Sequence, residues 1–117
     1  MLTCDWNKYD ENVLATGSVD TLIKIWDVRN PMSPLETLHG HQYAVRRLRF
    51  SPHSESVLAS CSYDMSVAVW NLDSDQNPLM RRYSDHSEFV VGLDFNLFDE
   101  DKLLSCGWDE SVFLWKV

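Results

Sequence analysis

The sequence predicts an all-β fold made of small repeated antiparallel sheets, and one recurring spacing is the main reason. Thr16, Asp20 and Trp26 are separated by four and then six positions. The same intervals recur in two further sets, which are Ser60, Asp64 and Trp70, then Ser105, Asp109 and Trp115. Repeats of about 40–45 residues with four strands each are typical of β-propeller blades. The sequence therefore predicts part of a β-propeller.

A pair of histidines extends this repeat frame. His41 and His86 each lie 19 positions before the serine of their set. The matching position before Thr16 would precede residue 1, so the first unit is expected to be incomplete. Because propellers close with four to eight blades, we expect about two and two-thirds four-stranded blades from the C-terminal part of a seven-bladed ring. The expected single domain, residues 1–117, divides into units 1–33, 34–77 and 78–117, of which the last lacks its outer strand.

Short runs rich in Val, Ile, Leu and aromatic residues, separated by turn residues, indicate the strands. In chain order we expect them at Leu2–Trp6, Val13–Ser18, Leu22–Val28, Leu35–Leu38, Ala44–Phe50, Val57–Ser62, Ser66–Leu72, Leu79–Tyr83, Phe89–Phe95, Lys102–Gly107 and Ser111–Val117. The fourth and eighth follow proline-bearing segments, which suits outer strands because an edge tolerates a missing N–H. No helix is required.

Composition and charge exclude several classes of function. With 117 residues, 44% of them hydrophobic, the chain is long enough for one folded domain. The net charge of −8 argues against nucleic-acid binding, since that affinity rests on Lys and Arg. Arg46, Arg47 and Arg49 are a local basic spot, although alternation along a strand prevents one continuous stripe. The sequence has no long apolar run, so direct membrane insertion is not expected.

The cysteines do not indicate a metal site or a disulfide. Cys4, Cys61 and Cys106 include no C-x-x-C pair. Cys61 and Cys106 each follow the repeat serine by one position, so we expect small buried residues at equivalent places in two blades. No cofactor and no metal are expected.

The repeated polar residues could be catalytic or structural. His41, Ser60 and Asp64 are the residue types of a nucleophilic triad, but the serine lies mid-strand, outside any G-x-S-x-G elbow, and the set recurs. We therefore expect no enzyme activity and a hydrogen-bonded chain from Trp indole to hydroxyl to His to Asp. Its expected members are Thr16, Asp20, Trp26, His41, Ser60, Asp64, Trp70, His86, Ser105, Asp109 and Trp115.

The repeats resemble the WD-repeat family over the whole chain. The resemblance rests on Leu38-His39-Gly40-His41 and Trp26-Asp27 within the repeat frame. Asp85 stands where the motif has Gly, while Asn71 and Lys116 replace the Asp that follows Trp. These departures leave the network positions intact.

Longer runs resemble the peroxin-7 family of import receptors, most of all its plant members. These runs are Leu2–Tyr9, Tyr43–Arg47, Phe50–His53, Ala59–Val67 and Gly107–Glu110. The resemblance implies a receptor, found in the cytoplasm and the peroxisome matrix, for cargo with a type 2 peroxisomal targeting signal. That signal is a short N-terminal helix-forming peptide: Arg or Lys, an aliphatic residue, five variable positions, His or Gln, and a small aliphatic residue. The implied partners are cargo, a peroxin-5-type co-receptor and the peroxisomal docking machinery.

A basic amphipathic peptide needs apolar contacts and an acidic rim. We expect both at the end of the propeller that holds the turns between second and third strands and the approaches to the innermost strands. Tyr63 and Trp108 lie in those turns and Phe89 lies near such an approach, and these three are the candidate peptide contacts. Glu88 is expected to attract the basic residue of the peptide. The remaining candidates for binding peptide or co-receptor are Tyr43 and Arg46. The alternative is that these residues cover seams between blades or face solvent.

A second hypothesis is a substrate adaptor of a cullin-type ubiquitin ligase or a general interaction scaffold. Trp26-Asp27-Val28-Arg29 matches the W-D-x-R element of such adaptors. Arg29 follows a third strand and should lie at the opposite end of the propeller from Tyr63. The two hypotheses therefore use different surfaces.

Overall fold

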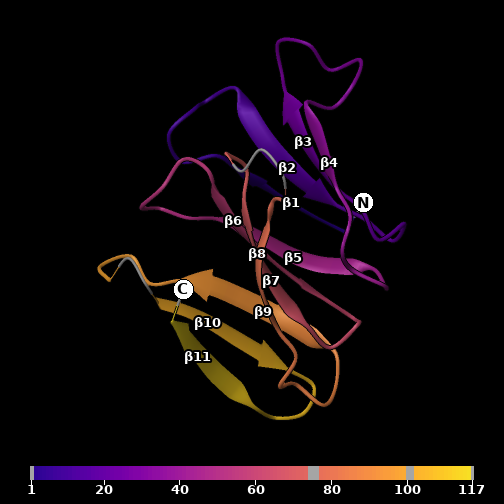
Figure 1. Cartoon of the computed structure of the whole chain (residues 1–117), viewed down its shortest axis with the longest axis vertical. Helices are drawn as coiled ribbons and strands as arrows, with labels where there is room; N and C mark the ends of the chain where they lie inside the picture. The colour runs from indigo at the N-terminus through magenta and orange to yellow at the C-terminus, as the bar shows by residue number, and fades with distance from the viewer. Residues whose placement is uncertain (1, 74–76, 100–101, 117) are drawn as a thin grey trace.

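The computed structural model describes residues 2–73, 77–99 and 102–116, and its regular structure there is entirely β (Figure 1). The strands are β1 (Thr3–Trp6), β2 (Val13–Gly17), β3 (Ile23–Asp27), β4 (Glu36–Leu38), β5 (Val45–Phe50), β6 (Val57–Ser62), β7 (Val67–Asn71), β8 (Leu79–Tyr83), β9 (Val90–Phe95), β10 (Lys102–Gly107) and β11 (Val112–Lys116). All of the expected strands are present, with bounds that differ by at most one residue at each end. The predicted end at Val117 lies outside the described residues.

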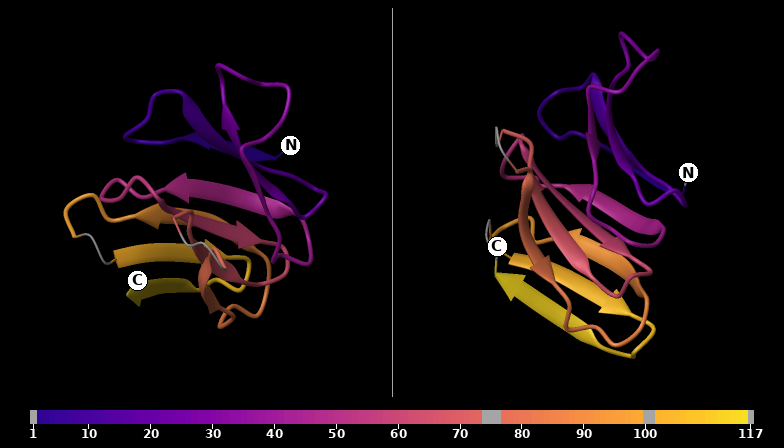
Figure 2. Two further views of the ribbon diagram at one scale, coloured as in Figure 1. Left: turned by 45° about the horizontal axis from the view of Figure 1, so that its top comes forward. Right: turned by 45° about the vertical axis from the view of Figure 1, so that its right-hand side comes forward.

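The strands form three antiparallel sheets in chain order. Strands β1 to β4 make the first sheet, β5 to β8 the second, and β9 to β11 the third. The first strands β1, β5 and β9 are neighbours across the sheets. Figure 2 shows the sheets stacked from the indigo N-terminal sheet to the yellow C-terminal strand. This is the arrangement of successive propeller blades, and it confirms the predicted all-β fold class.

Side-chain alternation gives each sheet two faces, and each seam between sheets buries its own core. Ile23 and Ile25 of the first sheet pack in one cluster with Leu48, Phe50 and Trp70 of the second. The opposite face of the second sheet packs against the third. Its cluster comprises Ala59, Cys61, Val67, Val69, Val90, Leu93, Phe95 and Leu103. Burial raises the pKa of the Cys61 thiol to about 12, so this thiol is an inert core group at neutral pH.

The outward face of the third sheet has the composition of another seam. Leu104, Val112 and Leu114 occupy the repeat positions of Ala59, Val67 and Val69. The residues of the second sheet are fully buried, whereas Leu114 is 63% exposed. The difference arises because the third sheet covers the second.

Each turn between a second and a third strand contains one residue with positive φ. These residues are Thr21 (74°), Met65 (68°) and Glu110 (63°), each directly after the repeat aspartate. This left-handed conformation is uncommon for residues other than glycine. It recurs because the aspartate accepts the N–H two positions further on, from Leu22, Ser66 and Ser111 in the three sheets. We call this end of the sheets the turn end, and the end where first strands connect to second strands the hairpin end.

Candidate functional site

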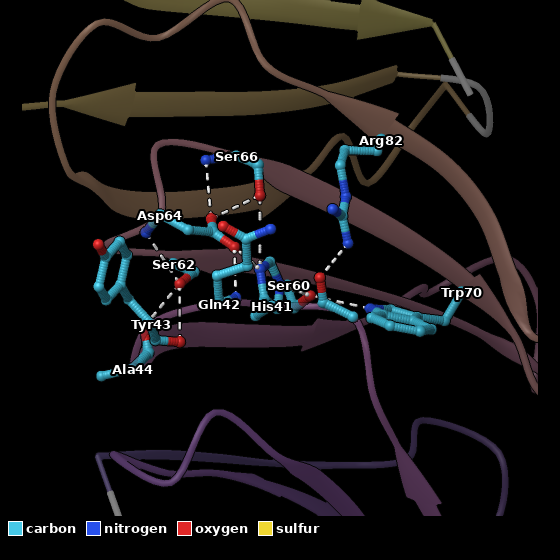
Figure 3. Close-up of polar contacts among 11 residues, drawn as sticks. His41, Gln42, Tyr43, Ala44, Ser60, Ser62, Asp64, Ser66, Trp70 and Arg82 are labelled. Atoms are coloured by element: carbon cyan, nitrogen blue, oxygen red, sulfur yellow. Dashed lines mark hydrogen bonds and ion pairs between the residues drawn. The ribbon is translucent and has the colours of Figure 1, made fainter.

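In the second sheet a chain of hydrogen bonds joins four side chains (Figure 3). The indole N–H of Trp70 donates to Ser60 Oγ at 2.8 Å, and Ser60 Oγ lies 2.7 Å from His41 Nε2. His41 Nδ1 lies 2.9 Å from Asp64 Oδ2. Because Ser60 accepts from Trp70, its hydroxyl donates to Nε2, and His41 then donates from Nδ1 to Asp64.

The carboxylate at the end of this chain holds two loops together. Asp64 accepts the backbone N–H of Gln42 at 3.0 Å and the hydroxyl of Ser66 at 2.5 Å. Burial alone would raise the pKa of Asp64. The bonds from His41, Ser66 and Gln42 outweigh burial and hold that pKa below its ordinary range. The approach to β5 is thereby fixed against the turn between β6 and β7.

The third sheet contains the same connections. Trp115 donates to Ser105 Oγ at 2.8 Å, which lies 2.9 Å from His86 Nε2. His86 Nδ1 lies 3.1 Å from Asp109 Oδ2. The backbone N–H of Ser87 is the largest influence lowering the pKa of Asp109.

The first sheet has a shorter version. Trp26 donates to Thr16 Oγ1 at 3.0 Å, and Asp20 accepts the N–H of Leu22 at 3.1 Å. Within the described residues, no histidine occupies the repeat position that would link Thr16 to Asp20. Among the described residues, the complete side-chain chain is present at the turn end of sheets two and three.

The geometry at Ser60 favours a structural role. Its hydroxyl is fully buried and engages both Trp70 and His41. A nucleophile must be exposed to substrate and supported by an oxyanion hole. The repetition of the arrangement at Ser105 also favours a structural role.

Acid should weaken these networks. Asp64 and Asp109 have folded-state pKa values below the ordinary 3.8. Their ionised forms therefore stabilise the fold above that value, and the contribution is lost as pH falls through the lowered pKa. The free energy of unfolding, measured by urea titration, should decrease as pH falls below about 4. Asp64→Asn should cost about 1–2 kcal/mol at pH 7 and make the acid decrease shallower. An unchanged pH profile in this variant would contradict the role given to Asp64.

Gly40 allows close approach of the Trp70 ring. A Cβ added at Gly40 would lie 2.8 Å from the indole. Gly40→Ala should therefore cost about 1–3 kcal/mol by overpacking, as measured by thermal unfolding. The matched control is Asp85→Ala, at the equivalent position of the third sheet, where the side chain is exposed. That substitution should change the free energy of unfolding by no more than about 0.5 kcal/mol. Equal losses of stability in both variants would rule out the packing explanation.

An apolar groove of about 590 Å³ lies at the turn end, across the first seam and into the second. Among its lining residues are Val19, Thr21, Tyr43, Tyr63, Met65 and Phe89. Tyr43 is 60% exposed, so its ring is available for contact. The groove is lined by the turns between second and third strands and by the loops that follow the repeat histidine.

Three aromatic rings form a cluster at the edge of this groove. The Tyr63 and Phe89 ring centroids are 4.7 Å apart, and those of Phe89 and Trp108 are 5.0 Å apart. Trp108 is 63% exposed. Aromatic surface at such an exposed site is typical of binding contacts.

The candidate residues divide into two groups. Tyr43, Tyr63 and Phe89 line the groove, and Trp108 packs on two of them. Glu88 is exposed directly beside Phe89 in the chain but is not a lining residue. Arg46 is half-buried where the pairing of β5 and β6 shifts register, outside the groove lining.

Several groove residues were not predicted from the sequence. Val19 and Met65 line the groove, and neither was a candidate. Val19 holds the same repeat position as Tyr63 and Trp108, directly before the aspartate. Applying the repeat frame to every unit would have found it.

Arg29 lies at the hairpin end, after β3. Its guanidinium bonds both oxygens of Asp27, at 3.0 and 2.7 Å, which lowers the pKa of Asp27 to about 2. The W-D-x-R element therefore forms a local ion pair far along the sheet from the groove.

Successive antiparallel sheets of three or four strands, two of them tied by a Trp–Ser–His–Asp chain, define a β-propeller of the repeat class. The family profile "WD domain, G-beta repeat" matches residues 2–27, 32–71 and 77–116, and the chain belongs to the WD-repeat family. No helix in the described residues is long and apolar enough to cross a membrane.

Parts of the chain are similar to three curated relatives. The chain is 56% identical over 71 residues to the peroxisomal targeting signal 2 receptor of Dictyostelium discoideum, covering 61% of this chain and 22% of the relative. It is 52% identical over 67 residues to peroxisome biogenesis protein 7 of Arabidopsis thaliana, covering 57% and 21%. The peroxisomal targeting signal 2 receptor of Schizosaccharomyces pombe is 36% identical over 100 residues, covering 85% and 32%. The matches thus span between a fifth and a third of these relatives.

Proposed function

We propose that this chain is part of a receptor for the type 2 peroxisomal targeting signal and that the turn-end groove holds the peptide. The observation that carries the proposal is the groove itself, lined by Tyr43, Tyr63 and Phe89, in a chain similar to receptors of that name. Cargo delivery with a peroxin-5-type co-receptor, between the cytoplasm and the peroxisome matrix, belongs to the same proposal.

The chemistry of the groove suits an amphipathic helical peptide. The aliphatic side chains of the peptide would lie against the exposed rings and against Met65, which is adaptable and polarizable. Glu88 stands exposed beside Phe89 and would attract the Arg or Lys of the signal. The net charge of −8 adds long-range attraction for a basic peptide. No covalent chemistry is involved.

Charge reversal at Glu88 tests the proposed ion pair. Glu88→Lys should weaken binding of an Arg-bearing signal peptide about tenfold, which corresponds to about 1.4 kcal/mol. An otherwise identical Arg-to-Gln peptide should lose much less affinity, because the charge that Glu88 attracts is absent. Fluorescence anisotropy measures the affinity of each peptide at two salt concentrations. Added salt should weaken binding of the Arg-bearing peptide. Equal losses for the two peptides would remove Glu88 from this role.

Arg29→Ala is the matched control at the hairpin end. The receptor hypothesis expects unchanged peptide affinity for this variant, since Arg29 contacts Asp27 away from the groove. A ligase adaptor would instead lose ligase docking. Loss of peptide binding in Arg29→Ala would argue that the groove is not the peptide site.

A further inference from the structure

Within the described residues, two arginines on an innermost strand form no ion pair with a carboxylate. Arg47 and Arg49 of β5 line a cavity of about 380 Å³ together with Leu2, Thr3 and Cys4 of the adjacent β1 region. Both arginines are half-buried. Side chains two positions apart on a strand lie on the same face, about 7 Å apart, so both guanidinium groups reach the same space.

Among the residues that the structure describes, each of these guanidinium groups donates one hydrogen bond. Arg47 Nη1 donates to the carbonyl of Arg46 at 3.4 Å, and Arg49 Nη1 donates to the carbonyl of Leu48 at 3.1 Å. Each guanidinium has five N–H donors. Neither arginine forms an ion pair within the described part of the chain.

Asp5, an acid group on the neighbouring strand β1, does not neutralise the pair. Asp5 of β1 is engaged by Lys8 at 2.8 Å and by the backbone N–H of Phe50 at 2.9 Å. In contrast, Arg29 is paired with its own carboxylate. In a chain with a net charge of −8, the lining of this cavity thus carries two arginines and no carboxylate.

We infer that Arg47 and Arg49 bind a small phosphate-bearing anion in this cavity, a function beyond that proposed for the turn-end groove. A guanidinium presents a planar fork that matches phosphate oxygens in a bidentate manner. Two such forks supply two positive charges, which suits a dianionic phosphate better than a single carboxylate. Thr3, a residue with a hydroxyl group, also lines this cavity.

The test is calorimetric titration of the full chain with inorganic pyrophosphate at constant ionic strength. Arg47→Gln and Arg49→Gln should each weaken binding about tenfold, because each removes charge-assisted hydrogen bonds. Arg47→Lys keeps the charge and should still lose several-fold, because the fork is gone. Arg81→Gln, on the exposed strand β8, should bind like the unchanged protein. Circular dichroism verifies that each variant is folded.

The outcomes separate a specific site from general attraction. Affinity that falls only in the Arg47 and Arg49 variants supports the assignment. An equal loss in Arg81→Gln, or no measurable binding of pyrophosphate, would overturn it. Binding of a triglutamate peptide in place of pyrophosphate would also overturn it, because the site would then take an acidic protein segment. None of these results depends on the targeting peptide.

Discussion

Replacing Trp70 by alanine is expected to lower the free energy of unfolding by about 3–5 kcal/mol. The indole is 1% exposed and packs in the seam between the first two sheets. Its N–H also bonds Ser60 Oγ, so the change creates a cavity and leaves a buried hydroxyl short of one partner. Urea unfolding followed by circular dichroism measures the loss, which should be larger than that of any other substitution considered above.

Two variants separate the causes of this loss. Trp70→Phe keeps much of the buried area but removes the donor to Ser60, so it should cost about 1–3 kcal/mol. Trp108→Ala removes an exposed indole of the same size and should stay below about 1 kcal/mol. If Trp108→Ala proved as destabilising as Trp70→Ala, the buried network would not be what holds the sheets together.

Replacing Tyr63 by alanine is expected to weaken binding of the targeting peptide about 30-fold, or about 2 kcal/mol. Tyr63 lines the groove and packs on Phe89 at 4.7 Å, so its loss removes both contact area and support for a second ring. The measurement is fluorescence anisotropy with a labelled signal peptide. Because Tyr63 lies in a turn rather than in the core clusters, the unfolding midpoint should barely change.

Tyr9→Ala is the matched control for this effect. Tyr9 is also exposed, but it lies at the hairpin end, where its hydroxyl bonds the carbonyl of Pro52 at 2.8 Å. Peptide affinity should be unaffected by its loss. Equal weakening by Tyr9→Ala and Tyr63→Ala would place the peptide elsewhere or make its binding nonspecific.

The fold was largely predictable because the repeat supplies the same information more than once. The repeat spacing predicts where the turns lie, and strand propensity predicts β-strands in the segments between them. The sequence alone could not show which turn residues take positive φ. Thr21, Met65 and Glu110 share that conformation although their residue types have no common preference for it, because the neighbouring aspartate imposes it.

The candidate site was predictable only in part. Tyr63, Phe89 and Trp108 could be placed at one end of the sheets from the repeat frame, but the groove depends on how neighbouring blades pack. Val19 and Met65 line it because the first and second sheets meet there. The arginine-lined cavity escaped notice for a similar reason, since Arg47 faces residues of β1 that are distant in sequence.

Photo-crosslinking tests the peptide site most directly. A type 2 signal peptide carrying a photoreactive residue in place of one variable position would be bound to the full chain, irradiated and analysed by mass spectrometry. Attachment at Tyr43, Tyr63, Met65 or Phe89, competed by unlabelled peptide, is the predicted result. Attachment confined to hairpin-end residues such as Tyr9 or Phe98 would contradict the assignment of the groove as the receptor surface.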